Sequence, residues 1–281
     1  MNFILQAGKE FFKKQSPARL ITLGFAGVIL LGTVLLKLPV SLREGAEVHW
    51  IDALFTSTSA VCVTGLIAID TAEHFTVFGR TVVALLIQIG GLGVTSVGVG
   101  IILAAGRKIG FKERLLVKEA LNVSGFQGMV ILVKHVLFMT LCFEGVGAVL
   151  SFLVFVQKYS PLDALGISMF HSIAAFNNSG FDILGGLTNL IPYQGNVLLN
   201  LTTCGLIIFG GLGFLVILDV LKNRNFRRLS LHSKAVIFTS VVLLAVGTLS
   251  LKCTEDITWL GAFFQSVSAR TAGFSTYPIG S

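Results

Sequence analysis

Five apolar segments, each about as long as a membrane span, restrict what this chain can fold into. They cover residues 20–36, 76–105, 130–156, 196–218 and 235–251. A helix crosses the hydrocarbon core of a bilayer with about 20 mostly apolar residues. Hydrophobic residues make up 54% of the chain and charged residues 12%, about half the charged fraction of a typical soluble protein. We therefore expect an all-α integral membrane protein.

Basic residues predict the orientation of these segments. Two-thirds of the lysines and arginines fall ahead of the first segment, between the second and third, and between the fourth and fifth. Cytoplasmic loops are enriched in Lys and Arg, so we expect a multi-pass protein with a cytoplasmic N-terminus, whose residues 1–18 lie at the membrane surface. The net charge of +7 then reflects topology, and we expect no nucleic-acid partner. The basic groups are Lys9, Lys13, Lys14 and Arg19; Arg107, Lys108, Lys112, Arg114 and Lys118; and Lys222, Arg224, Arg227, Arg228 and Lys234.

Acidic residues show the opposite bias. Nine of the 14 carboxylates lie in outer loops or in the short polar stretches between spans. Two interpretations stay open: a negative outer mouth that concentrates cations, or ordinary solvated loop charge. The nine are Glu44, Glu47, Asp52, Asp70, Glu73, Asp163, Asp182, Glu255 and Asp256.

An internal repeat organises the chain. The octapeptide IQIGGLGV at 87–94 recurs 120 residues later as IIFGGLGF at 207–214. The repeating unit is a span, an outer loop, a short helix, a glycine-containing stretch and a second span. We assign two complete units, 19–118 and 119–232, and an incomplete third at 233–281. The glycines of the octapeptide suit a helix hinge or, as we favour, a surface against which the short helix packs closely.

Short amphipathic helices are expected at 50–60, 163–176 and 257–269, each ahead of a glycine. They are too short to cross the membrane, so each enters from the outside and turns back. Irregular backbone at membrane depth is tolerated where it lines a watery cavity. Carbonyl oxygens facing such a cavity can replace the hydration shell of a cation, and glycine permits the backbone angles that align them. Each glycine stretch is therefore a candidate wall of an ion filter.

The three stretches, CVTGL at 62–66, NNSGF at 177–181 and RTAGF at 270–274, together with the duplicated GGLG, resemble the Trk/Ktr/HKT superfamily of potassium transporters. The likeness is strongest to the Ktr-type membrane subunit and covers the chain from about Arg19 onward. It implies tandem parallel M1–re-entrant pore helix–M2 units, arranged pseudo-fourfold around an ion pore, of which about two and a half are present. The implied filter carbonyls are those of Val63, Thr64, Gly65, Asn178, Ser179, Gly180, Thr271, Ala272 and Gly273. The implied filter support, just below, is Cys62, Asn177 and Arg270.

The resemblance also implies a function. It predicts the ion-translocating subunit of a potassium uptake system of the bacterial plasma membrane, with K⁺ passing inward and Na⁺ open as a second cargo or an activator. Glycine in all three stretches favours K⁺. The implied partners are membrane lipid, a second copy of the chain in a homodimer, and a cytoplasmic nucleotide-binding ring of the KtrA type. We expect no organic cofactor in this chain, which lacks the G-x-x-x-x-G-K-[ST] phosphate-binding motif.

The number of repeats departs from the superfamily pattern. The superfamily has four repeats, and a filter with three walls cannot close. We therefore expect that these 281 residues are part of a longer chain, with missing walls supplied from another protein as the alternative.

Two other classes of function are weaker. An alternating-access carrier for Na⁺ or another small cation has broken helices, but its repeats are inverted, whereas these short helices all enter from one side. An intramembrane enzyme needs a nucleophile with a base, or a metal cluster, and the spans offer neither. We therefore expect a transporter and not an enzyme.

Several single residues have structural interpretations. Glu144 lies inside an apparent span, where a buried hydrogen bond and a role as an ion relay are equally open. Arg270 is expected to point behind the filter and pair with a carboxylate. His135 and His171 are expected to pack against neighbouring helices, and Asn177 to hold the filter in place.

The starts of the short helices can also be predicted. Asp52 and Asp163 suit the N-cap or first turn of the first two short helices, and Thr254 or Asp256 suits the start of the third.

Overall fold

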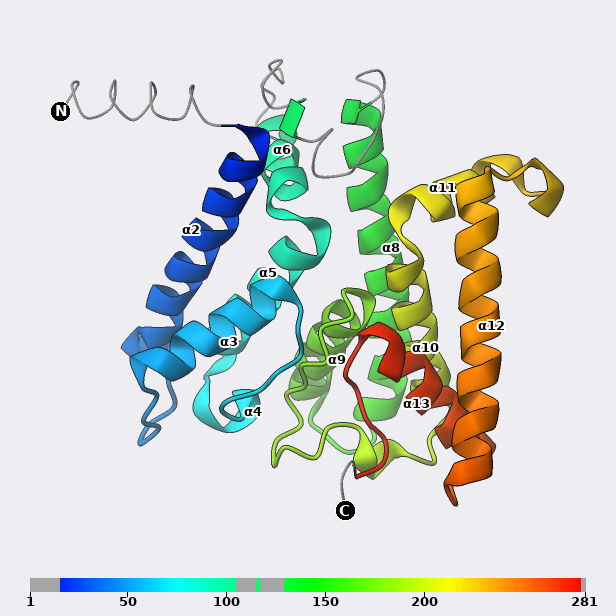
Figure 1. Cartoon of the computed structure of the whole chain (residues 1–281). Coiled ribbons are helices and arrows are strands. Elements are labelled where there is room, and N and C mark those ends of the chain that lie inside the picture. The colour runs from blue at the N-terminus through cyan, green and yellow to red at the C-terminus, as the bar shows by residue number, and fades with distance from the viewer. Residues whose placement is uncertain (1–15, 105–114, 117–128, 279–281) are drawn as a thin grey trace.

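The computed structural model describes residues 16–104, 115–116 and 129–278, which form a bundle of helices (Figure 1). The expected surface segment 1–18 and the basic stretch 107–118 lie almost entirely outside the described residues. Three of the described helices are long and apolar enough to cross a membrane, or five spans result if each of two bent helix pairs counts as one. The five predicted segments coincide with these elements.

The helices follow the order of the predicted units. In Figure 1 the start of α2 and the junction of α11 with α12 lie at the top of the view, and the loops predicted to be on the outer side lie at the bottom. The first unit contains α2 (Pro17–Lys37), η1 (Pro39–Ser41), α3 (Trp50–Cys62), α4 (Thr71–His74), α5 (Val77–Leu92) and α6 (Val94–Ala104). The second contains α8 (Met129–Phe155), α9 (Pro161–Phe176), η2 (Ile191–Tyr193), α10 (Val197–Leu212) and α11 (Phe214–Asn223). After η3 (Phe226–Arg228), the third contains α12 (Leu231–Thr254) and α13 (Trp259–Thr271).

The predicted short helices are α3, α9 and α13, and their N-terminal ends show how each begins. The side chain of Asp52 accepts from the backbone N–H of His49, the N-cap of α3. Asp163 lies in the first turn of α9 and accepts from the hydroxyl of its N-cap, Ser160. The expected N-cap of the third helix was wrong, because Thr258 occupies that position and accepts from a backbone N–H of the first turn.

The second and fourth predicted spans are bent, as in the less favoured of the two interpretations of their glycines. The axis turns by 103° between α5 and α6, and by 95° between α10 and α11. Both bends fall at the third glycine of the GGLG sequence, where Gly93 and Gly213 have φ of +80° and +85°. A right-handed helix cannot continue through such a residue. The second half of each pair therefore leaves the direction of the first.

One contact repeats in all three units and fixes each short helix to the preceding span. A serine of the short helix donates to a carbonyl of the span, and three residues further along the span a glycine leaves room for that serine. A Cβ at this glycine would overlap the serine hydroxyl. The serine, the carbonyl residue and the glycine are Ser57, Ile29 and Gly32 in the first unit (2.8 Å), Ser172, Glu144 and Gly147 in the second (2.7 Å), and Ser266, Leu244 and Gly247 in the third (3.1 Å).

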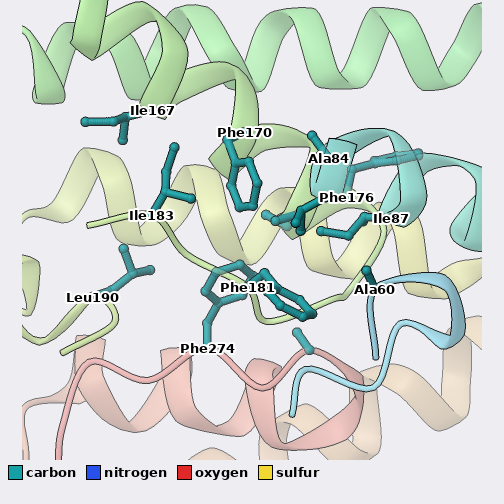
Figure 2. Close-up of a cluster of buried hydrophobic side chains, with 14 of the residues drawn as sticks. Ala60, Ala84, Ile87, Ile167, Phe170, Phe176, Phe181, Ile183, Leu190 and Phe274 are labelled. Atoms are coloured by element: carbon teal, nitrogen blue, oxygen red, sulfur yellow. The ribbon is translucent and has the colours of Figure 1, made fainter. Parts of the chain in front are cut away.

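Aromatic and aliphatic side chains from all three units fill the space between them (Figure 2). Phe176, Phe181 and Phe274 are at most 2% exposed, and they come from the end of α9 and from the two segments that follow the glycines. Because these segments carry large buried side chains, their backbone is held in place by the core.

Candidate ion-binding site

The three glycine segments that follow α3, α9 and α13 meet at one place in the bundle. A Cβ on Gly65 would lie 2.7 Å from the carbonyl oxygen of Ser179, and one on Gly180 would lie 2.5 Å from that of Ala272. The Cβ position of Gly273 lies 3.8 Å from the Cα of Gly180. Each segment thus touches the next, as expected of adjacent walls of one filter.

Glycine is required here for two reasons. Gly65, Gly180 and Gly273 have φ of +72°, +71° and +77°, in the left-handed region that residues with a Cβ rarely adopt. At Gly65 and Gly180 a side chain would also collide with the backbone of the next segment. The need for a special backbone angle was predicted from the sequence. The collision could not be predicted, because it depends on contacts between units.

Each short helix holds the segment that follows it. The backbone N–H of Thr64 donates to Ser59 O at 3.0 Å, and that of Ser179 to Ala174 O at 2.8 Å. In the third unit the carbonyl of Ser268 accepts from the N–H of Ala272 at 2.9 Å and from that of Gly273 at 3.5 Å. All three segments are therefore tied by a backbone bond to the last turns of their own helices.

Several carbonyls in these segments are free to face an ion. Within the described part of the chain, the carbonyl oxygens of Thr64, Ser179 and Ala272 accept no hydrogen bond. Beyond the glycine the pattern changes, because Ser59 Oγ donates to the carbonyl of Leu66 at 2.7 Å. Ser268 and Phe274 form the matching bond in the third unit, at 2.5 Å. A carbonyl at membrane depth needs a partner, and a cation can be that partner.

The GGLG sequence of each unit lies directly against the end of the short helix. A Cβ on Gly90 would overlap the carbonyl oxygen of Val61, and one on Gly210 would overlap that of Phe176. The second glycine faces the next segment, since a Cβ on Gly91 would overlap the side chain of Asn177. The predicted close-packing role therefore fits the first two glycines, whereas the third is the bend.

Asn177 is held from several sides, as its predicted supporting role requires. It is the C-cap of α9. Its Nδ2 lies 2.9 Å from Ile173 O, 3.1 Å from Gln88 Oε1 and 3.1 Å from Glu144 Oε1. Glu144 thus makes a buried hydrogen bond, one of its two predicted roles, while Gln88 was not singled out from the sequence.

Asn178 contacts the third unit, whereas Asn177 contacts the first. In the orientation that satisfies its surroundings, its amide donates to Ala175 O and Ile207 O at 3.1 and 3.2 Å and accepts from Thr271 Oγ1 at 3.2 Å. It therefore connects the second segment to the third. Cys62, which matches Asn177 in the first unit, is an exposed free thiol, and its supporting role stays a prediction.

The expected carboxylate partner of Arg270 was wrong, and its predicted place behind the filter stays a prediction. Its guanidinium donates to the hydroxyl of Ser240 on α12, at 3.3 Å. Within the described residues this is a hydroxyl contact rather than an ion pair with a carboxylate. The residue ahead of the third segment is thus tied to the first span of its own unit.

His171 packs as predicted, whereas His135 is exposed and contacts a carbonyl of its own helix. His171 is 3% exposed, its Nε2 lies 2.9 Å from Thr203 Oγ1, and its ring makes edge contacts with Phe155 and Phe274. The Nδ1 of His135 lies 2.8 Å from Ile131 O of its own helix.

Carboxylates on the outer side connect the first two units. Asp70 caps α4 and also accepts from the N–H of Leu187 at 3.0 Å, while Glu73 accepts from that of Gly186 at 3.2 Å. Asp182, two residues after Gly180, is 9% exposed. Burial raises the pKa of Asp182 to about 6, and the charge of Asp70 adds to the shift. Several of the acidic residues thus have structural roles, and the negative outer mouth stays a prediction.

Asn189 joins the second and third segments on the outer side, and sequence reasoning missed it. Its Oδ1 accepts from the backbone N–H of Ser275 at 3.2 Å, and its Nδ2 lies 3.4 Å from Gly180 O. A φ of +51° is compatible with asparagine more readily than with most residues. An asparagine between a glycine pair and a proline, GGLTNLIP, was the available signal.

This architecture defines a class of helical membrane proteins in which re-entrant helices carry glycine segments to a common centre. Within that class the chain belongs to the TrkH family of cation transport proteins, whose family model matches residues 2–255. This family assignment agrees with the class of protein that the sequence predicts.

Individual relatives agree with this assignment. The chain is 41% identical over 279 residues to the Ktr system potassium uptake protein B of Bacillus subtilis, and 39% identical over 277 residues to the potassium/sodium uptake protein NtpJ of Enterococcus hirae. Both alignments cover 95% of this chain, but the chain spans 62% and 61% of these relatives. The fold is similar to that of the potassium transporter TrkH from Vibrio parahaemolyticus, with a TM-score of 0.64 at 21% identity over 94% of this chain and 53% of the other. This likeness confirms the predicted fold.

Proposed function

We propose that this chain forms three walls of the selectivity filter in a potassium uptake protein, through which K⁺ passes inward. The observation that carries the proposal is the convergence of three glycine segments in which the carbonyls of Thr64, Ser179 and Ala272 accept no hydrogen bond from the described residues. The names of relatives at 41% and 39% identity, a potassium and a potassium/sodium uptake protein, support the same cargo. The proposal includes the division into units at 19–118, 119–232 and 233–281.

The mechanism follows from the charge distribution. K⁺ would gather at the acidic outer side, lose water against the carbonyl oxygens, and enter a cavity on the cytoplasmic side. The C-terminal ends of α3, α9 and α13 precede the filter, and a helix C-terminus carries about half a negative charge. The membrane potential favours inward movement of one charge by about 2.3 kcal/mol per 100 mV.

A glycine pair tests this function. The protein is expressed from its natural gene in a bacterium that lacks its own potassium uptake, and ⁸⁶Rb⁺ uptake is measured. We expect uptake by the wild type and a loss of at least tenfold with Gly65→Ser, which strains a φ of +72° and meets Ser179 O. Gly45→Ser is the matched control, since Gly45 has a similar φ of +77° in an outer loop with open space around it. No uptake by the wild type, or equal uptake by both variants, would contradict the proposal.

Sodium is the alternative cargo, favoured by the printed name of the Enterococcus relative. We expect Na⁺ to compete weakly for ⁸⁶Rb⁺ uptake, because all three walls carry glycine. If Na⁺ inhibited ⁸⁶Rb⁺ uptake at the same concentration as K⁺ does, the filter would have no preference for K⁺ over Na⁺.

The remaining wall needs a source. We propose that protein outside these residues completes the ring, and the intact mass of the natural product tests this. A mass well above 30.0 kDa would place the wall in the same chain. A mass of 30.0 kDa with no membrane chain copurifying would contradict a closed filter.

We further propose a homodimer in the plasma membrane, with the N-terminus in the cytoplasm and a nucleotide-binding ring of the KtrA type below it. The basic segment Lys222–Arg228, at the end of α11 and in η3, supplies a surface for such a ring. Light scattering of the purified protein, with and without its copurifying chains, should give a dimer mass. Reversal of Lys222, Arg227 and Arg228 to glutamate should release the ring, and intact binding would rule this surface out.

A further inference from the structure

Glu144 is a buried carboxylate in the middle of a membrane helix. It lies on α8 and is 7% exposed. An ionisable side chain at this depth is costly and is kept where it has a specific partner or function. Its Oε1 accepts from Asn177 Nδ2 at 3.1 Å, and Asn177 directly precedes the second filter segment. The carboxylate is therefore one side chain away from the filter backbone.

Asn177 transmits this contact because it has little freedom to move. Its Nδ2 carries two hydrogens and faces three acceptors, Gln88 Oε1, Glu144 Oε1 and Ile173 O, all within 3.1 Å. Its side chain lies on Gly91, where a Cβ would overlap it. A side chain fixed between α5, α8 and its own helix fixes the backbone that follows.

Glu144 also holds α9 through its backbone. Its carbonyl oxygen accepts from Ser172 Oγ at 2.7 Å, as part of the contact repeated in all three units. The same residue therefore positions the short helix with its main chain and the end of that helix with its side chain.

The matching positions in the other units are different. The residues whose carbonyls receive the serine are Ile29 in the first unit and Leu244 in the third, and neither can accept a side-chain hydrogen bond. In the octapeptide of the second unit, Ile208 replaces Gln88. The polar cluster of Gln88, Glu144 and Asn177 is thus specific to the joint between the first and second units.

We propose that Glu144 is a positioning residue that fixes the second filter wall through Asn177, and that it thereby determines how well the filter distinguishes K⁺ from Na⁺. The inference rests on the proposed function, because it concerns the selectivity of the same filter. In this proposal, selectivity depends on the hydrogen-bond acceptor of Glu144 and not on its negative charge.

Paired variants separate the acceptor from the charge. Glu144→Gln keeps an oxygen acceptor without the charge, whereas Glu144→Ala removes both. The readout is the ratio of the Na⁺ and K⁺ concentrations that halve ⁸⁶Rb⁺ uptake by the protein expressed from its natural gene. We expect Glu144→Ala to lower this ratio about tenfold, the scale of one lost hydrogen bond, and Glu144→Gln to stay within about twofold of the wild type. Thr140→Ala, one turn earlier on α8 at a buried hydroxyl without a partner among the described residues, should leave the ratio unchanged.

A double-mutant cycle tests the route through Asn177. Asn177→Ala should reproduce the effect of Glu144→Ala, and the double variant should be no worse than either, because one interaction is lost in each case. Additive losses would overturn the proposal. Equal losses in Glu144→Gln and Glu144→Ala would also overturn it, by showing that charge is required.

A measurement without transport keeps this inference separate from the proposed function. Hydrogen exchange of a peptide spanning 177–183 should speed up in Glu144→Ala and not in Glu144→Gln or Thr140→Ala. Unchanged exchange in Glu144→Ala would overturn the positioning role even if the wild type transports. Failure of wild-type uptake would instead contradict the proposed function alone.

Discussion

The first two filter walls and the third reach the same place by different backbone routes. In the first two, a residue with left-handed φ, Val63 at +55° and Asn178 at +57°, follows the helix and precedes the filter glycine by two positions. In the third, Ala272 directly precedes the glycine with φ of −108°. From the serine that docks the short helix to the filter glycine there are eight residues in the first two units and seven in the third.

The walls also differ in the hydrogen bonds that hold them in place. All three walls are tied to their own helices, by backbone bonds of 3.0 Å at Thr64, 2.8 Å at Ser179 and 2.9 Å at Ala272. The third wall is held in addition by the second unit, through Thr271 on Asn178 and Ser275 on Asn189. The second wall is thus supported by its own helix and supports its neighbour.

The largest effect should come from exchanging glycine and alanine where the second wall touches the third. Gly180→Ala places a Cβ 2.5 Å from Ala272 O at a φ of +71°, so we expect ⁸⁶Rb⁺ uptake to fall by more than tenfold. Ala272→Gly, at an ordinary φ, should keep most of the uptake. If the two variants lost uptake equally, the asymmetry between the walls would be wrong.

Val63 and Asn178 occupy matching positions with left-handed φ. Exchanging their residue types should change the free energy of unfolding in opposite directions. Asn178→Val introduces a β-branched residue at positive φ and removes the bonds to Ala175, Ile207 and Thr271, at a cost of about 2–3 kcal/mol. Val63→Asn relieves the same strain and should stabilise the protein by about 1 kcal/mol. Thermal unfolding in detergent measures both, and destabilisation by Val63→Asn would contradict the interpretation.

Acidity should affect the second wall specifically, because Asp182 stands where the other walls have Ile67 and Ser275. Its pKa in the folded protein is raised to about 6 from an ordinary 3.8, so the folded state holds this proton more tightly than the unfolded state. The free energy of unfolding should therefore fall as pH rises from about 4 to about 6, by on the order of 2 kcal/mol. Asp182→Asn should abolish this part of the pH dependence in unfolding scans. A slope that persists in Asp182→Asn would assign it to another group.

The smallest effect concerns the bridge from the second wall to the third. Asn189→Ala removes the acceptor for Ser275 N and should cost about 1 kcal/mol. Hydrogen exchange should increase at 273–277 and remain unchanged at 63–67, the first wall. Equal increases in both segments would show that Asn189 stabilises the bundle generally.

Much of the fold was predictable because it depends on local sequence. Apolar length located the five spans, and the glycines located the ends of the short helices. The bends were not favoured because a GGLG sequence does not reveal whether its helix is continuous or broken. Only the positive φ of Gly93 and Gly213 distinguishes the third glycine, where the helix bends, from the first two, which pack closely.

Residues defined by contacts between units were harder to predict. Gln88 and Asn189 act on segments about 90 residues away, and no periodicity marks them. Alignment by the docking serines pairs Phe264 with Phe170, and both are buried. Alignment by the glycines would pair Phe170 with Phe263 instead, because the third unit has one residue fewer between serine and glycine.

The two asparagines of the second unit bear on how such a chain can change over evolutionary time. Copies of one ancestral unit begin as interchangeable, but Asn177 now fits Gln88 of the preceding unit and Asn178 fits Thr271 of the following one. Exchanging the first two units would place Ile208 beside Cys62, and Gln88 beside Arg270 instead of Asn177. The order of the units along the gene is therefore fixed by side-chain chemistry, and recombination that shuffles them would be selected against.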